Sequence, residues 1–298
     1  SVMLEAATTS FQLHLKVHPD MAVRAYNASI ILAAPMVAAT ANSPYLFGHD
    51  LWNETRIPLF EQSVSVGGIA GASQGPLRRV TFGSGYARDS ILECFVENEQ
   101  HYPVLLPMLF SDGVERMSHL RLHNGTIWRW NRPLIGFDYD GMPHLRIEHR
   151  VVPGGPGIAD VIANAALFFG LMQTLMMQSE PPEHELAFSS ARDNFYAAAQ
   201  QGLDAHITWL GERRGSVQAL FVDKLLPQAR AGLAALEIDA TDIDRYLGII
   251  EARVRTGQTG SAWQRAWVER HGRDMTALTH AYRERQDSGS PVHEWGLD

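Results

Sequence analysis

The sequence predicts an α+β fold, in which an antiparallel sheet with helices on one face is followed by a helical C-terminal part. Residues 10–17 and 144–152 alternate apolar and polar side chains, as half-buried strands do. In the last part of the chain the apolar residues recur almost everywhere with the period of a helix. The proline- and glutamate-rich segment 179–185 separates the two patterns. We therefore expect an α+β region over residues 1–178 and a helical region, packed on it, over residues 179–298.

Each of the two predicted strands has an apolar face and a polar face, because successive side chains of a strand point in opposite directions. The first strand places phenylalanine, leucine and valine on one face. The second places leucine, isoleucine and valine on one face, together with His149. The polar faces are formed by Gln12, His14 and Lys16 in the first strand and by Arg146, Glu148 and Arg150 in the second.

The segments around these strands are predicted to be helices, loops and turns. Pro19 and Asp20 begin a helix that runs towards Ala41, and Pro35 is expected to kink it or to split it in two. Residues 67–85 are rich in glycine and serine and are predicted to be a loop, which lacks the lysine of a phosphate-binding P-loop. The remaining predicted elements are a helix over 88–99, a turn and an aromatic edge segment over 123–133, a hairpin connection over 137–143, and helical stretches over 187–210, 217–236, 242–255 and 261–285.

The composition narrows the class of protein. The chain has 298 residues, 45% hydrophobic and 19% charged, which is typical of a soluble globular protein. A formal net charge of -8 and the lack of a basic run argue against a nucleic-acid surface. Cys94 is the only cysteine of the sequence, which excludes a disulfide within the chain and a cysteine-based zinc site. We therefore predict a cytoplasmic location.

Residues 158–177 form a stretch that is long and apolar enough for a membrane span. Asp160, Asn164 and Gln173 interrupt it, and no flanking basic residues mark a cytoplasmic side. We therefore predict a buried or half-buried core helix, and we expect neither a membrane nor a nucleic acid as a partner.

The polar faces of the two strands can form one site if both strands belong to one sheet. The carboxylate of Glu148 and the imidazole of His14 can ligate Mg²⁺ or Mn²⁺, and the neighbouring arginines can hold phosphate or carboxylate oxygens. This combination suits phosphoryl transfer, which depends on positioning and charge neutralisation. The alternative interpretation is a cross-strand ladder of exposed ion pairs, which is common and contributes little to stability.

Several motifs resemble one enzyme superfamily. RIEHRVVPGGPGIADVIANAALFFGLM, from Arg146, is similar to the strand and helix segment of the glutamine-synthetase-like carboxylate–amine ligases, and TSFQLHLKV resembles the family's other strand, where a Q-x-H pair lies on the cavity face. YNASIILAAPMVAATANSPYLFG, ETRIPLF, HNGTIWRWNRP and RVRTGQTGSAWQ look like the glutamate–cysteine ligase branch. Their order and spacing, from Thr8 to Gln264, favour the ligase over the ion-pair ladder.

The resemblance implies a glutamine-synthetase-like catalytic fold and an ATP-dependent ligase of the glutamate–cysteine ligase type, as in glutathione biosynthesis. In such enzymes ATP phosphorylates a carboxylate, typically the γ-carboxylate of glutamate, and an amine, typically that of cysteine, displaces phosphate from the acyl phosphate to form an amide. By their positions in the motifs, Glu148 and His14 resemble metal ligands, Arg150 and Arg132 resemble catalytic arginines, and Gln12, His14, Asn42, Arg56 and Arg146 resemble contacts to the nucleotide or substrate.

The implied ligands are ATP, Mg²⁺ (or Mn²⁺) and amino acids, and the helical C-terminal part is a candidate interface for a homo-oligomer. The family has earlier strands that carry further acidic metal ligands, whereas only Glu5 precedes the first strand here. The fold is therefore expected to be incomplete at the N-terminus, with weak Mg²⁺ binding and an inactive or poorly active isolated chain. The alternative function is a truncated or non-catalytic relative that binds a nucleotide or an amino acid.

Overall fold

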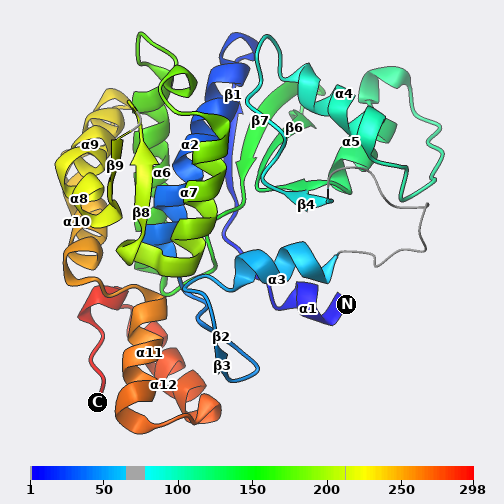
Figure 1. The fold of residues 1–298 in the computed structure, drawn as a ribbon. Helices are drawn as coiled ribbons and strands as arrows, with labels where there is room; N and C mark the ends of the chain where they lie inside the picture. The colour runs from blue at the N-terminus through cyan, green and yellow to red at the C-terminus, as the bar shows by residue number, and fades with distance from the viewer. Residues whose placement is uncertain (1, 65–77, 212) are drawn as a thin grey trace.

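The computed structural model describes residues 2–64, 78–211 and 213–298. Its central sheet has three antiparallel strands in the order β1–β7–β6, beside a large group of helices (Figure 1). The predicted α+β class is confirmed. The strands are β1 (Leu13–Val17), β2 (Tyr45–Leu46), β3 (His49–Asp50), β4 (Val80–Thr81), β5 (Trp128–Arg129), β6 (Asn131–Phe137), β7 (Pro143–His149), β8 (His206–Trp209) and β9 (Arg213–Ser216).

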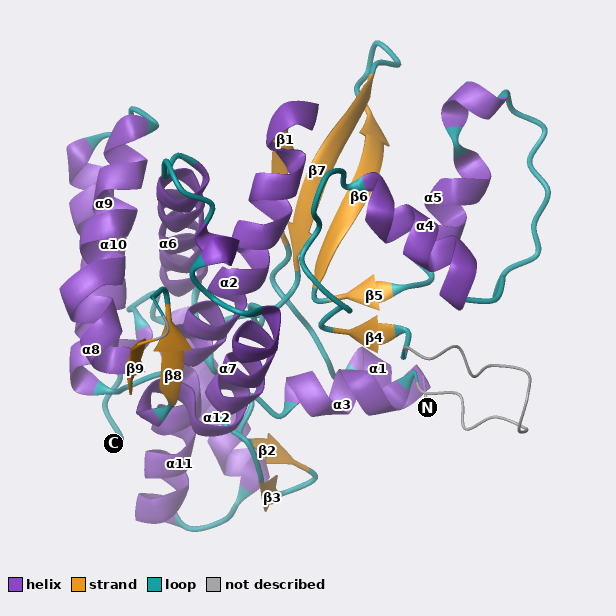
Figure 2. Cartoon of the chain, turned by 45° about the horizontal axis from the view of Figure 1, so that its top comes forward, coloured by secondary structure: helices purple, strands orange, loops and turns teal. Residues whose placement is uncertain are grey.

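Helices make up most of the rest of the described chain (Figure 2). The α-helices are α1 (Val2–Ala6), α2 (Ala22–Thr40), α3 (Arg56–Ser63), α4 (Leu92–His101), α5 (Ser118–Gly125), α6 (Ile158–Met176), α7 (Phe188–Gln201), α8 (Val217–Leu220), α9 (Leu226–Ala235), α10 (Ala240–Thr256), α11 (Gly260–His271) and α12 (Met275–Asp287). A π-helical segment, Phe221–Leu225, joins α8 to α9. The predicted loop over 67–85 lies mostly outside the described residues.

The central sheet buries its apolar face on α2 and α6. Leu13 and Val17 of β1 and Ile147 of β7 belong to the main hydrophobic core. His149, at the end of β7, is also buried, and its ring stacks on that of Phe168 in α6 with ring centroids 4.5 Å apart. The predicted division of both strands into an apolar and a polar face is therefore present in the structure.

Helix α2 lies at the centre of this core. All of its residues except Val23 and Arg24 are buried, and the helix continues through Pro35 to Thr40. Two helical stretches, Pro19–Thr40 and Ile158–Met176, are long and apolar enough to cross a membrane by length and composition alone, and 83% and 50% of their most apolar windows are buried. Core helices of soluble proteins pass the same test; the first stretch is mostly buried in the molecule, and the second is half buried.

The C-terminal region differs from the predicted all-helical layout in two places. The first is the β8–β9 hairpin, because α7 ends at Gln201 and Gly202 adopts a positive φ of 60° that redirects the chain. The second is the predicted helix over 261–285, which is two helices, because Gly272 has a φ of 86° between them.

Helix α4 also begins later than the sequence predicted, at Leu92 rather than near Arg88. The Glu93 carboxylate accepts hydrogen bonds from the backbone N–H groups of Arg88, Asp89 and Ser90, which holds the preceding residues in a turn. This is the competition between local side-chain bonding and helix formation.

The hydrophobic core extends over both predicted regions. Residues of α2 and α6 share it with residues of α7, α9 and α10. A second cluster lies around α11 and α12 and includes Trp263, Trp267 and Trp295. Asn42, between α2 and β2, connects the two parts, because its amide hydrogen-bonds to the hydroxyl of Tyr282 in α12 and to the carbonyl of Gly154.

Candidate functional site

The polar face of the sheet carries a row of three side chains from three adjacent strands. His14 in β1 lies directly opposite Glu148 in β7, and Glu148 lies directly opposite Arg132 in β6. Direct cross-strand neighbours project from the same face of a sheet. The sheet register therefore brings together His14 and Glu148, which are 134 positions apart in the sequence.

Glu148 is the centre of this row. Its Oε2 accepts hydrogen bonds from Arg132 Nε at 2.9 Å and from Arg150 Nη1 at 3.0 Å. His14 Nε2 lies 3.5 Å from Oε1. With its amide nitrogen turned towards Glu148, Gln12 donates to Oε1 at 3.0 Å and accepts from Arg150 Nη1 at 3.2 Å. The structure thus places Gln12, His14, Arg132, Glu148 and Arg150 in one cluster.

The electrostatics of the cluster favour a charged Glu148 and a neutral His14. Burial by itself would raise the pKa of Glu148, but the nearby guanidinium groups of Arg132 and Arg150 outweigh it, and the pKa is lowered. Burial lowers the pKa of His14, and the opposing effect of Glu148 does not cancel it. With two arginines and one carboxylate, the core of the cluster has an excess of one positive charge at neutral pH, which suits an anionic ligand.

A polar cavity of about 260 Å³ lies beside this cluster. Gln12 and Arg150 belong both to the cluster and to the wall of the cavity. The Nε of Arg150 is buried and has no hydrogen-bond partner among the described residues, although such groups are rarely left unpaired. The other wall residues are Glu5, Ala6, Thr8, Thr9, Ser10, Arg56, Phe60 and Trp130.

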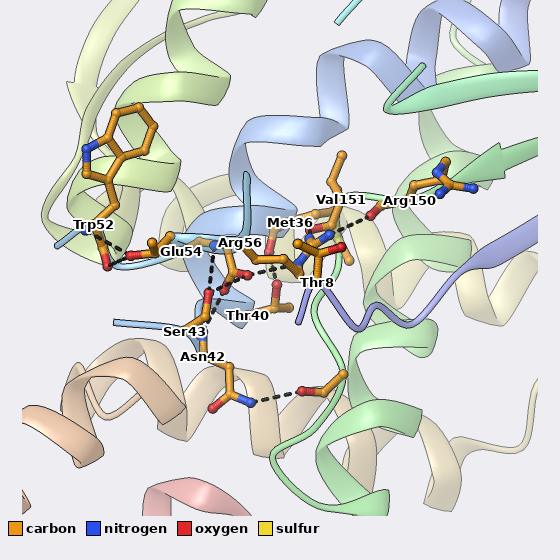
Figure 3. A network of polar contacts seen from close by, with 12 residues as sticks. Thr8, Met36, Thr40, Asn42, Ser43, Trp52, Glu54, Arg56, Arg150 and Val151 are labelled. Carbon is orange, nitrogen blue, oxygen red and sulfur yellow. Dashed lines mark hydrogen bonds and ion pairs between the residues drawn. The ribbon is translucent and has the colours of Figure 1, made fainter. Parts of the chain in front are cut away.

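Asn42 and Arg56, two further predicted contacts, lie in a neighbouring network of polar bonds (Figure 3). Arg56 is buried, pairs with Glu54 at 3.0 Å and also reaches the cavity wall. Asn42 donates its backbone N–H to Glu54 Oε2 at 2.8 Å, and its side chain contacts Gly154. Their predicted roles as nucleotide or substrate contacts stay predictions.

Arg146, the last predicted contact, lies one step along the same face. It is opposite Lys16 in the pairing of β1 with β7. Lys16 forms an exposed ion pair with Asp138 at 2.7 Å, whereas the buried Nε of Arg146 has no partner within the described part of the chain. A role in ligand binding stays a prediction for Arg146.

The predicted metal site is less complete than the arginine cluster. Glu148 and His14 are adjacent, but the described residues contain no group of three or more acidic, histidine or cysteine side chains that could hold a metal ion. Mg²⁺ prefers six oxygen ligands, and Oε2 of Glu148 is already shared by two arginines. These two side chains by themselves therefore do not fit Mg²⁺.

Glu54 is a part of this region that the sequence interpretation did not select. Its carboxylate is completely buried between Arg56 and the backbone of Asn42. The available signal was the spacing of an acidic and a basic residue in ETRIPLF, just before the buried helix α3.

The family model described as glutamate-cysteine ligase family 2 matches residues 1–281. None of the curated proteins matches the sequence.

Proposed function

Because the chain belongs to glutamate-cysteine ligase family 2, we propose that it catalyses ATP-dependent formation of an amide between a carboxylate and an amine. The acid would be an amino acid such as glutamate, and the amine that of an amino acid such as cysteine. The observation that carries this proposal is the excess positive charge at Arg132, Arg150 and Glu148, with Arg150 in the wall of a polar cavity.

The proposed reaction has two steps. A carboxylate oxygen of the acid attacks the γ-phosphorus of ATP, the bond to the bridging oxygen breaks, and ADP leaves with the electron pair. The amine nitrogen then attacks the acyl carbon of the acyl phosphate, the carbon–oxygen bond to phosphate breaks, and the nitrogen loses a proton. Both steps concentrate negative charge on oxygens, which positioned arginines stabilise.

The residues of the cluster have separate tasks in this proposal. Arg150 would hold the phosphoryl or carboxylate oxygens in the cavity through the donors that Glu148 leaves free. Glu148 orients Arg150 and Arg132 through its Oε2. Gln12 bridges Glu148 and Arg150 and adds an amide contact at the cavity wall.

Phosphate release from ATP tests the proposal, using the complete gene product with glutamate and a panel of amines. We expect release that requires both the acid and an amine, and that falls at least about a hundredfold in Glu148→Ala, because Arg150 and Arg132 lose their orienting partner. Asp193→Ala, which removes the exposed partner of Arg192, is the matched control. Unchanged turnover in Glu148→Ala would refute the proposed site. ATP binding by calorimetry without turnover would instead favour the non-catalytic relative.

A further inference from the structure

Glu54 is buried between Arg56, which lines the cavity, and the backbone of Asn42. It is 0% exposed. Its carboxylate accepts hydrogen bonds from the backbone N–H of Asn42 at 2.8 Å, from Ser43 Oγ at 2.8 Å and from Arg56 Nε at 3.0 Å (Figure 3). A buried carboxylate with three donors is held in one orientation and is costly to disturb.

Arg56, the partner of Glu54, hydrogen-bonds to the backbone directly after strand β7. Arg56 donates through Nη1 to the carbonyl of Arg150 at 3.4 Å and through Nη2 to the carbonyl of Val151. Its guanidinium also lies over the ring of Trp130, 5.4 Å from the centroid. Because Nε is bonded to Glu54, the planar guanidinium has one orientation in which both amino groups meet these carbonyls.

Arg150 needs such support because it lies beyond the last residue of β7, His149. Its backbone N–H donates to the carbonyl of Trp130 at 2.9 Å, and its own carbonyl accepts from Arg56. The residue is therefore fixed on both sides of its Cα, while its side chain reaches Glu148.

We propose that Glu54 is a positioning residue of the site, which acts through Arg56 on the backbone of Arg150 and so sets the direction of the Arg150 guanidinium. The same carboxylate receives the backbone N–H of Asn42, whose side chain contacts Tyr282 of α12. The placement of Arg150 is thereby connected to the C-terminal helices. Only the activity measurement below rests on the proposed function; the spectroscopic measurement does not.

A buried ion pair that only stabilises the fold is the competing explanation, and the chain contains a matched control for it. Asp160 and Arg253 form a pair at 2.7 Å with side chains 0% and 1% exposed. Asp160 also accepts hydrogen bonds from backbone N–H groups, those of Gly157 and Val292. The Asp160 pair thus resembles the Glu54 pair in burial and bonding, but none of its residues lines the cavity or belongs to the Glu148 cluster.

The test compares Glu54→Gln and Asp160→Asn in the complete protein. The Arg150 side chain is followed by the NMR signal of its Nε–H group, assigned as the signal that disappears in Arg150→Lys. We expect this signal to shift in Glu54→Gln and to stay in place in Asp160→Asn. We also expect kcat to fall about tenfold or more in Glu54→Gln, with little change in the KM for the amine, because small misplacement of a reacting group costs up to about a hundredfold. In Asp160→Asn, kcat per folded molecule should equal that of the wild type.

An unmoved Arg150 signal in Glu54→Gln, or equal losses of kcat in both variants, would overturn the proposal. If Glu54→Gln does not fold, Arg56→Lys, which keeps the charge but loses the planar fork, is measured in the same way. If the wild type shows no ligase turnover, the proposed function fails, and the NMR signal still decides whether Glu54 positions Arg150.

Discussion

Arg132 Nε and Glu148 Oε2 lie 2.9 Å apart at directly opposed positions of β6 and β7. Both residues are buried, with 8% and 3% of their surface exposed. Arg150 shares the same carboxylate oxygen. Glu148 is therefore the common partner of a buried cation, Arg132, and a half-buried one, Arg150, and this arrangement determines how the site should respond to mutation.

Removal of Glu148 should destabilise the protein, because it leaves buried guanidinium groups without their counter-charge. We expect Glu148→Ala to lower the free energy of unfolding by about 3–5 kcal/mol in urea titrations. Asp138→Ala removes the exposed partner of Lys16 and should change the free energy of unfolding little, because exposed ion pairs contribute little to stability. Similar costs for both variants would contradict the assignment of Glu148 as a buried partner.

His149 should make the stability depend on pH between neutrality and mild acid. Burial lowers its pKa from 6.5 to about 3, so the folded protein keeps the ring neutral while the unfolded chain takes up a proton below about 6.5. The free energy of unfolding should therefore decrease as the pH is lowered. Between pH 7 and pH 5 this group should account for a decrease of about 2 kcal/mol. In urea titrations over this pH range, the free energy of unfolding of His149→Phe should decrease by about 2 kcal/mol less than that of the wild type. Parallel pH curves for wild type and variant would show that His149 is not buried in the neutral form.

Arg150 should not tolerate lysine, although lysine keeps the charge. Lysine lacks the planar fork of Arg150, which binds Glu148 through Nη1 while the side chain also lines the cavity. We expect Arg150→Lys to lower kcat for ATP-dependent amide formation by about a hundredfold. Arg192→Lys, at an exposed pair with Asp193, is the matched control and should retain wild-type turnover. Equal kcat in the two variants would remove Arg150 from the proposed mechanism.

Gly232 of α9 should not tolerate a side chain, because α9 and α6 are in close contact at this position. A Cβ added there would lie 1.9 Å from the carbonyl oxygen of Gly170 in α6. Gly232→Ala should lower the free energy of unfolding by about 3 kcal/mol, since the backbones must separate. Gly248→Ala in α10, where an added Cβ meets nothing within 4 Å, should instead stabilise by about 0.5–1 kcal/mol. Thermal unfolding of the two variants distinguishes these opposite signs.

The polar faces of β1 and β7 could be predicted from the sequence because the period of two fixes which side chains share a face. That His14 lies opposite Glu148, and Arg132 beyond it, depends on the register, which the period of two does not give. The family resemblance implied a shared metal for His14 and Glu148 and a separate place at the substrate rim for Arg132. The Glu54 network depends on contacts with the carbonyls of residues 150 and 151, which no local pattern reveals. Gly202 and Gly272 ended helices that apolar periodicity alone would have continued.

The Glu148 cluster forms only when β1, β7 and β6 pair in this register. The register therefore also determines which insertions and deletions the protein can tolerate. The turn between β6 and β7, around Gly141, can gain or lose residues without moving Glu148, because main-chain hydrogen bonds hold the paired strands. A single residue inserted inside β7 would exchange its two faces beyond that point, placing Glu148 against α2 and turning His149 outward. Insertions and deletions among homologous proteins should therefore occur in the turn between β6 and β7 and be absent from β7.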